Sequence, residues 1–250
     1  MEMLLVALLA GVPALAAHSA PAGASASTQH WTYIEHRIES GYFQQDAVGL
    51  AGVAATLATE GGAEWQNYYA ALAAYRLALL ARGDERRAWP YTQQCIDRLD
   101  RVLVVDTSSA EALALQSACL ALQSHLDPWR SPLAAPLSRA RGEKALKLAP
   151  DNPRVLLLAA LATGERPRFF GGDSQQAYEL LLQSVSAFER ARAPVPGQPG
   201  WGAAEAFTYL AQDYLTRGQA LAARNVLERA LLVAPDFTQA KRLMAQIIAG

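Results

Sequence analysis

Residues 204–237 read AEAFTYLAQDYLTRGQALAARNVLERALLVAPDF, and the architecture of the chain follows from their pattern. The apolar residues recur at helical spacing in two blocks, which predicts two neighbouring helices. Small residues at Ala211, Ala223 and Ala230 let these helices cross closely, and larger side chains fill the gaps around them. Such a hairpin cannot bury its apolar face alone, so further hairpins must stack on it. We therefore expect an all-α repeat protein.

The spacing resembles the tetratricopeptide repeat (TPR), which has a period of about 34 residues. The first helix fits the pattern W-x2-L-G-x2-Y, with conservative replacements, at Phe207, Leu210, Ala211 and Tyr214. The second helix fits A-x3-F…P at Ala223, Leu227 and Pro235. The resemblance implies a right-handed α-solenoid of antiparallel helix hairpins, in which the first helix of each hairpin lines a concave face.

Four further tracts resemble a group of exported bacterial TPR proteins, most of them uncharacterised. The tracts are Trp65-Gln-Asn-Tyr-Tyr69, Asp151-Asn-Pro-Arg154, Phe170-Gly-Gly-Asp173 and Pro199-Gly-Trp-Gly202. The group implies no known reaction. More distantly, the architecture is similar to periplasmic TPR proteins that accompany the solute-binding proteins of transporters.

The same register recurs toward the N-terminus. Residues 145–150 (ALKLAP) mirror residues 230–235 (ALLVAP), and in both the proline ends a second helix. Asn152 and Asp173 are the expected N-caps of the two helices of the fourth pair, and a proline follows Asn152 at the first helical position.

We expect about five hairpins and a C-terminal capping helix in one domain, residues 27–250. The first expected pair is 29–39 with 42–59, joined at Ser40-Gly41, and the second is 65–82 with 92–105, joined by a loop that includes Asp84 and Pro90. The third pair is 109–124 with 133–148, and the helices of the fourth begin at Asn152 and Asp173. The fifth pair is 204–237, followed by the capping helix 239–248. Residues 190–200 hold three prolines and two glycines and are expected to connect the last two pairs.

Residues 1–26 are expected to be a signal peptide outside this domain. Residues 3–17 form an apolar run of suitable length, too short to span a bilayer, and three A-x-A cleavage motifs overlap or follow it. Glu2 stands where Lys or Arg is typical, so a buried N-terminal helix stays open as the alternative. A signal peptide predicts export to the bacterial periplasm, with residues 21–28 as a flexible lead-in.

Charge and composition narrow the function classes. The chain holds 22 Lys and Arg against 23 Asp and Glu, a formal net charge of -1, so no global basic field points to nucleic acid. Hydrophobic residues make up 52% of the chain, which supports a packed protein rather than a disordered one. Alanine and leucine dominate, which favours helices over strands.

Cys95 and Cys119 are the two cysteines. Both lie in helical patterns where a small apolar side chain would pack, so two buried thiols are one interpretation. A disulfide between adjacent antiparallel helices is the other, because an exported chain can be oxidised. The bridge needs closely spaced Cα atoms, and the sequence leaves the choice open.

No catalytic, cofactor or metal site is expected. His30 and His36 lie six residues apart, not the four at which one helix face shares a metal. The chain has no H-E-x-x-H, G-x-S-x-G, Walker A or G-x-G-x-x-G motif. The turn Gly171-Gly172-Asp173 precedes a helix and could hold a phosphate. A carboxylate already suits that positive helix end, so capping is the preferred interpretation.

A peptide or protein partner is expected to bind on the concave face. Apolar residues point into the stack, so the intervening residues of the first helices should point into the groove, namely Glu111, Arg154, Glu205, Thr208, Gln212 and Thr216. Arg154 between two acids suits a polar peptide or a chain terminus. A hydrated groove with weak local ion pairs is the alternative. Trp129 and Arg130, in a proline-bracketed loop, are further candidate anchors, unless Trp129 folds back onto the solenoid.

The repeat fold without catalytic groups predicts a non-catalytic scaffold, with no stable membrane span after signal removal. The alternative is a small-ligand or transporter accessory protein. It rests on the aromatic group Trp65, Tyr68, Tyr69 and Tyr75, although aromatic residues at helical spacing are more typical of a core. Trp201 is expected to pack the connector against the stack.

Overall fold

The computed structural model describes residues 22–59, 65–191 and 198–249, so residues 1–21 of the predicted signal peptide lie outside it. Within the described residues there are eleven α-helices and a short 3₁₀ helix, and no strand, which confirms the all-α prediction. The helices are α1 (Ala22–Phe43), α2 (Ala47–Thr59), α3 (Gln66–Leu80), α4 (Glu85–Val105), α5 (Ala110–Leu126), α6 (Ala134–Leu148), α7 (Pro153–Glu165), η1 (Arg168–Phe170), α8 (Ser174–Arg190), α9 (Ala203–Thr216), α10 (Ala220–Val233) and α11 (Thr238–Ala249).

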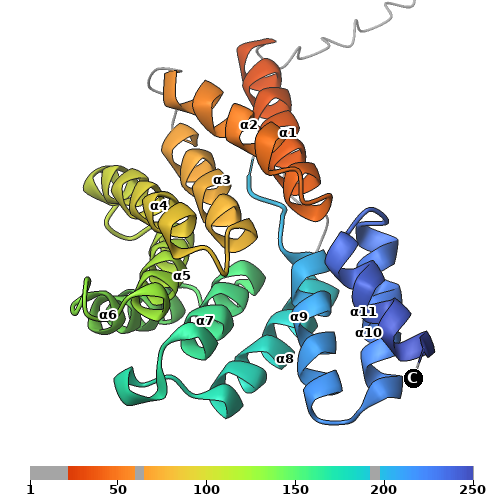
Figure 1. Cartoon of the computed structure of the whole chain (residues 1–250). Helices are drawn as coiled ribbons and strands as arrows, with labels where there is room; N and C mark the ends of the chain where they lie inside the picture. Colours follow the sequence, from red (N-terminus) through yellow and green to blue (C-terminus); the bar gives the residue numbers. More distant parts are fainter. Residues whose placement is uncertain (1–21, 60–64, 192–197, 250) are drawn as a thin grey trace, which may run out of the picture.

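Consecutive helices pack in adjacent pairs, from α1 with α2 to α9 with α10, and α11 packs against α10. The row of pairs curves, so that α3, α5, α7 and α9 face its centre while α4, α6 and α10 lie on the outer side (Figure 1). Across the described ranges, no helix combines the length and the apolar character that crossing a membrane requires.

The two ends of the row meet. The hydroxyl oxygens of Tyr42 on α1 and Tyr209 on α9 lie 3.3 Å apart, across 167 residues of sequence. The ring of Phe43 packs 4.4 Å from the ring of Phe237, which precedes α11. These contacts bring α1 beside the C-terminal helices (Figure 1), so the curved row closes on itself.

Two of the helices that face the centre, α3 and α5, are buried on nearly every side, which differs from the expectation of an open concave face. Twelve of the fifteen residues of α3 and thirteen of the seventeen residues of α5 are buried. Their many alanines let neighbouring helices approach from several directions, as in helices that are apolar all round. The chain itself therefore fills much of the predicted groove.

Both predicted N-caps of the fourth pair are confirmed. The Asn152 side chain accepts hydrogen bonds from two backbone N–H groups of α7, at 3.0 and 3.3 Å. Asp173 does the same for α8, at 2.8 and 3.0 Å. The caps satisfy the free N–H groups of each first turn, so these helices begin where the sequence indicates.

The first predicted turn is wrong. Ser40 and Gly41 lie inside α1, and the chain turns instead at residues 44–46, where Asp46 caps α2 by accepting a hydrogen bond from Gly49 at 2.9 Å. Gly41 serves helix packing rather than a turn, because a Cβ there would lie 3.2 Å from the Cβ of Leu50.

Two further boundaries also differ. Pro90 lies inside α4, which begins after its N-cap Asp84, so the predicted loop is shorter than expected. Pro90 is the sixth residue of the helix, so it removes one backbone hydrogen bond in the second turn, yet the helix continues to Val105. The expected flexible lead-in is helical from Ala22 onward, in keeping with the high helix propensity of alanine.

Cys95 on α4 and Cys119 on α5 form a disulfide. Their Cα atoms are 6.4 Å apart, within the range that the bridge requires. The interpretation as two free buried thiols is therefore wrong, although both side chains are buried as it expected. The bridge links the second and third helix pairs covalently.

Candidate functional site

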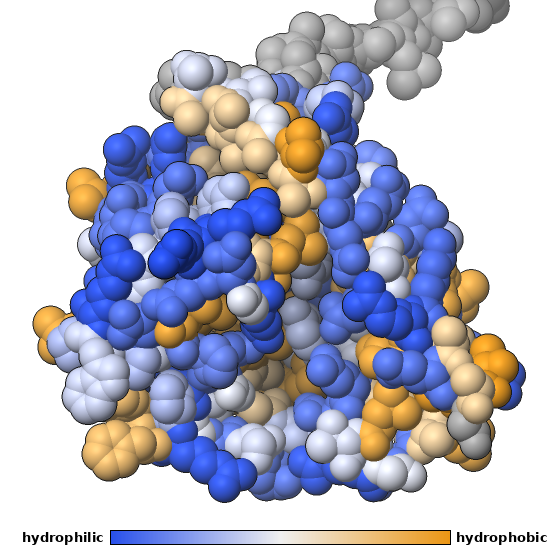
Figure 2. All heavy atoms as spheres, in the orientation of Figure 1, coloured by the Kyte–Doolittle hydropathy of each residue, from blue (hydrophilic) through white to orange (hydrophobic). Residues whose placement is uncertain are grey.

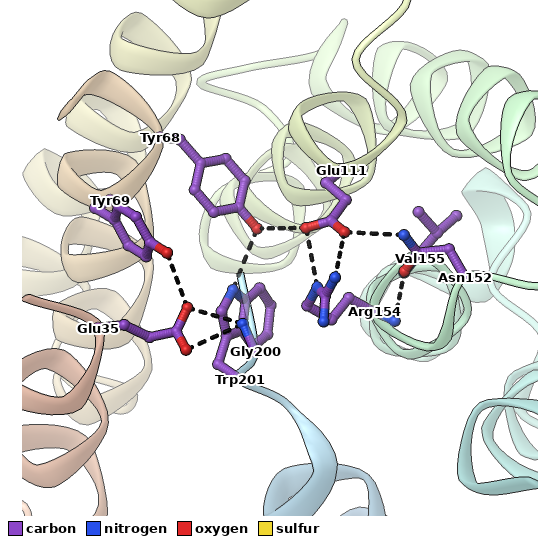
Figure 3. Close-up of polar contacts among 9 residues, drawn as sticks. All are labelled: Glu35, Tyr68, Tyr69, Glu111, Asn152, Arg154, Val155, Gly200 and Trp201. Atoms are coloured by element: carbon purple, nitrogen blue, oxygen red, sulfur yellow. Dashed lines mark hydrogen bonds and ion pairs between the residues drawn. The ribbon is translucent and has the colours of Figure 1, made fainter. Parts of the chain in front are cut away.

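Polar side chains gather where the inner helices meet. Figure 3 shows them pointing toward one another from α1, α3, α5, α7 and the segment before α9. We call this group the central polar cluster, and it consists of Glu35, Tyr68, Tyr69, Glu111, Asn152, Arg154, Gly200 and Trp201. It occupies the place where the sequence predicts a partner-binding groove.

One half of the cluster is an ion pair between Glu111 on α5 and Arg154 on α7. The guanidinium donates from Nε and Nη2 to the two carboxylate oxygens, at 2.9 and 2.6 Å. Asn152 and the Tyr68 hydroxyl donate to the same carboxylate, at 2.9 and 3.2 Å. Burial alone would lower the pKa of Arg154, but its hydrogen bonds and the charge of Glu111 raise that pKa above its ordinary value. This forked pairing holds both side chains in one orientation.

The other half centres on Glu35 of α1. Its carboxylate accepts a hydrogen bond from the Tyr69 hydroxyl at 2.9 Å, and both of its oxygens lie 3.0 Å from the backbone nitrogen of Gly200. Burial raises the pKa of Glu35, and these hydrogen bonds offset only part of the rise. The carboxylate therefore holds a backbone N–H group of a segment 165 residues away in sequence.

Residues 198–202 supply that segment, and they cross the centre of the molecule without regular secondary structure. Trp201 is 1% exposed, and its indole N–H donates to the Tyr68 hydroxyl at 3.2 Å. The guanidinium carbon of Arg76 lies 4.9 Å from the indole ring centre, within the range of a cation–π contact. The prediction that Trp201 packs the connector against the stack is thus confirmed.

Beneath the cluster, Arg76 on α3 and Glu205 on α9 form a fully buried ion pair. The guanidinium carbon of Arg76 also lies 4.4 Å from the ring centre of Tyr42. Burial alone would lower the pKa of Arg76, but the charge of Glu205 raises it above its ordinary value. The arginine is therefore enclosed between a carboxylate and aromatic rings.

Glu39 lies one turn after Glu35 on α1. Burial, followed by the charges of Glu205 and Glu35, raises the pKa of Glu39 to about 8. Glu39 is therefore mostly protonated at neutral pH. This neutral form reduces the excess of carboxylate charge around Arg76.

The predicted groove residues divide into three groups. Glu111 and Arg154 meet directly, as described above. Glu205 and Thr208 are fully buried, so the prediction that they face an open groove is wrong. Glu205 pairs with Arg76 of α3 instead of facing solvent, and Thr208 donates its hydroxyl to the backbone oxygen of Ala204 at 2.8 Å.

Gln212 and Thr216, the third group, lie further along α9 and are exposed. Both line a cavity of about 330 Å³ whose walls come from α7, α8, α9 and Arg82, which follows α3. Arg82 and Glu165 form an ion pair of 2.7 Å in its wall. Figure 2 shows this face of the molecule hollowed at its centre, between hydrophilic rims. We call this cavity the open mouth of the inner face.

Trp129 and Arg130 lie apart from the cluster, on the loop between α5 and α6. Trp129 is 92% exposed, so it does not fold back onto the helices. The Arg130 guanidinium carbon lies 4.1 Å from the ring centre of Trp89 on α4. The structure therefore does not bring these two residues together with the groove residues.

Sequence reasoning missed Glu35 and Arg76 as site residues. Arg76 carries a recognisable signal, since it is the single charged residue in the apolar run 70–81 (AALAAYRLALLA). A charge in such a run is rarely buried without a partner. Nothing comparable marks Glu35, because charged residues flank it on α1.

No protein-family model matches the chain, and a search of curated proteins finds no match. The TPR resemblance therefore stays a prediction. Throughout the three described ranges, His, Cys, Asp and Glu side chains form no group of three or more that could hold a metal ion.

Proposed function

We propose that this chain is a non-catalytic, TPR-like scaffold that binds an extended peptide segment of a protein partner on its inner face. Five helix pairs followed by a final helix support a TPR-like, right-handed solenoid. The small residues predicted to let the helices of the best-matching repeat cross closely, Ala211, Ala223 and Ala230, are completely buried.

The observation that carries the proposal is that the inner face already holds a peptide segment, its own. Glu35 accepts the backbone N–H of Gly200, while Tyr68 accepts the indole N–H of Trp201. Carboxylates that bind backbone N–H groups and pockets that enclose an aromatic side chain are the elements by which proteins bind extended peptides.

The open mouth lies on the same face beyond this segment. It exposes polar side chains that can form hydrogen bonds with a bound peptide. Gln212 and Thr216 are exposed there, and the carboxyl of Asp213 has its pKa raised by burial. A polar peptide bound in the mouth would lie along α9, next to the segment that the chain binds in cis. The net charge of -1 favours a protein over a nucleic acid as the partner.

Export to the bacterial periplasm is part of the proposal. Its supports are the apolar run at residues 3–17 with the A-x-A motifs, and the disulfide between Cys95 and Cys119. Disulfides persist in oxidising compartments and are rare in the cytosol.

The alternative role is a small-ligand or transporter accessory protein. The aromatic residues that supported this role are not available to a ligand. Tyr68, Tyr69 and Tyr75 are each at most 2% exposed, and Trp65 is partly buried and packs against the same core. The Tyr68 and Tyr69 hydroxyls bind other groups of the cluster, while the rings are enclosed by the core and are not accessible to a ligand from solvent. We therefore favour the peptide-binding role.

Site-specific photo-crosslinking tests the proposal. A benzoyl-phenylalanine is placed at Gln212 in the open mouth, and at Leu221, an exposed residue on the outer helix α10, as the matched control. After irradiation of intact cells that export the protein, a crosslinked partner is expected with position 212 and not with position 221. Equal crosslinking at both positions, or at neither, would refute binding on the inner face.

A further inference from the structure

A second cavity, of about 270 Å³, lies between α5, α6, α7 and the start of α8. Its walls share no residue with the central polar cluster or with the open mouth. Polar side chains dominate the lining, with Arg166 and Arg139 as its two cations. A polar cavity of this volume has room for a small ion together with several waters, since a water takes up about 30 Å³ of the liquid.

Arg166 is buried at the end of α7 without an acidic partner. It is 8% exposed and donates to two hydroxyl oxygens, those of Ser138 at 3.3 Å and Thr163 at 3.1 Å. Its Nε has no hydrogen-bond partner. Within the described part of the chain, no carboxylate forms an ion pair with it at 4.0 Å or less. Burial, and then the charge of Arg139, lowers the pKa of Arg166, and the charge of Glu143 offsets only part of that fall.

The two acids in the cavity wall are engaged elsewhere. Glu143 accepts a hydrogen bond from Nε of Arg139 at 3.0 Å. Asp173 caps α8. The charge of Arg166 is therefore left for something that enters the cavity, because buried arginines are otherwise paired with an anion.

The glycine turn before α8 holds the arginines in place. A Cβ at Gly172 would lie 1.8 Å from the backbone oxygen of Arg166, so only glycine fits there. Nη1 of Arg139 lies 3.6 Å from the position that a Cβ would take at Gly171. The N–H groups of Gly171, Gly172, Asp173, Gln175 and Gln176 already have partners, so the two arginines are the main donors for a ligand.

We propose that this cavity binds a small oxyanion, with Arg166 as the main cation and Arg139 at the mouth. A guanidinium presents coplanar N–H donors that match two oxygens of a carboxylate, phosphate or sulfate group. Bound anion supplies the counter-charge that the described protein groups do not. The site is independent of peptide binding on the inner face.

Thermal unfolding and calorimetric titration test the site, with sodium phosphate, sulfate and acetate in separate arms and sodium chloride at equal ionic strength as reference. At least one oxyanion should raise the melting temperature in a saturable way beyond chloride, because it binds the native state. Comparison of the arms shows whether the site prefers phosphate, sulfate or a carboxylate. If no arm exceeds chloride, the proposal is overturned.

Two charge variants test whether the oxyanion binds in this cavity. Gln176 lines the cavity and is exposed at the third position of α8, where glutamate suits a helix start. Gln176→Glu should fold and weaken oxyanion binding at least tenfold by repulsion. Gln183→Glu adds the same charge to the same helix away from the cavity, and should bind as the native chain does. Equal affinity in both variants would overturn the assignment.

Arg166→Met gives a second and independent signature. It removes the uncompensated charge, so its melting temperature in chloride should equal or exceed that of the native chain. The oxyanion-dependent rise should disappear. Arg168→Met, which changes an exposed arginine outside the cavity, should retain the rise. A rise retained in Arg166→Met would overturn the role of Arg166.

Discussion

Arg76 and Glu205 lie 129 residues apart in sequence and pair across the centre of the molecule, with 1% and 0% of their side chains exposed. They join the second helix pair to the fifth, so the pair forms only when the row of helices has curved back on itself. Nε of Arg76 and Oε2 of Glu205 have no hydrogen-bond partner. Because desolvating two charges costs several kcal/mol, we infer that the pair selects the closed arrangement more than it stabilises the fold.

Removing one member of this pair should destabilise the protein strongly. Arg76→Met or Glu205→Leu leaves the other charge buried and unpaired, and we expect a loss of about 3–5 kcal/mol in the free energy of unfolding. The double variant should lose less than either single variant, since it leaves no stranded charge. Urea unfolding of the three variants measures the coupling. Additive losses would show that the two side chains do not act as a pair.

The disulfide between Cys95 and Cys119 should stabilise the native state by about 3 kcal/mol, as expected when a bridge closes a loop of roughly 25 residues in the unfolded chain. The Cys95→Ser, Cys119→Ser double variant should unfold at a correspondingly lower urea concentration. Addition of a reductant should shift the native chain toward the variant and leave the variant unchanged. Free thiols in the unfolded, unreduced protein would contradict the bridge.

Local features of this fold could be predicted because their causes lie close together in sequence. Asn152 and Asp173 satisfy N–H groups within three residues of themselves, so the two helix starts are visible in the residue types alone. Gly41 shows the limit of such reasoning. A glycine after a serine is typical of a turn, yet here it lets Leu50 of the next helix approach, and that contact is not encoded in the neighbouring residues.

Which residues of the inner face are buried and which are exposed depends on contacts between distant parts of the chain. The helical register correctly directs Glu205 toward the centre, but whether the centre is open depends on how tightly the row curves. That curvature brings Glu35 to Gly200, and no local pattern records it. Glu205 is buried and Gln212, two turns later on the same helix, is exposed. The sequence alone therefore could not predict which of the two residues is accessible.

Stability should fall as the pH rises from about 5 to 8. The pKa of Glu39 is raised from its ordinary value of 4.5 to about 8, so between these values the native state keeps a proton that the unfolded state has lost. The stabilisation that protonated Glu39 contributes to the free energy of unfolding is complete below pH 4.5 and is lost as the pH passes 8. Urea unfolding at pH 5, 6.5 and 8 measures the slope.

Glu39→Gln fixes the neutral form and should flatten this dependence. A smaller slope should remain because the pKa of Glu35 is also raised by burial. Glu228→Gln, which changes a half-exposed carboxyl on α10, should keep the native slope. An unchanged slope in Glu39→Gln would contradict the proposed titration of Glu39.

Gly202→Ala should disrupt the segment that fills the inner face, and Gly218→Ala provides the matched control. Both glycines have positive φ, 111° and 73°, so alanine is strained at either position by about 1 kcal/mol. A Cβ at Gly218 meets nothing within 4 Å, whereas at Gly202 it lies 2.9 Å from the ring of Phe188 and 3.4 Å from Arg154. We expect losses of about 1 kcal/mol for Gly218→Ala and about 2–4 kcal/mol for Gly202→Ala, measured by urea unfolding. Gly202→Ala should also shift the fluorescence of the adjacent Trp201 toward that of an exposed indole, while equal losses in the two variants would argue against close packing of this segment.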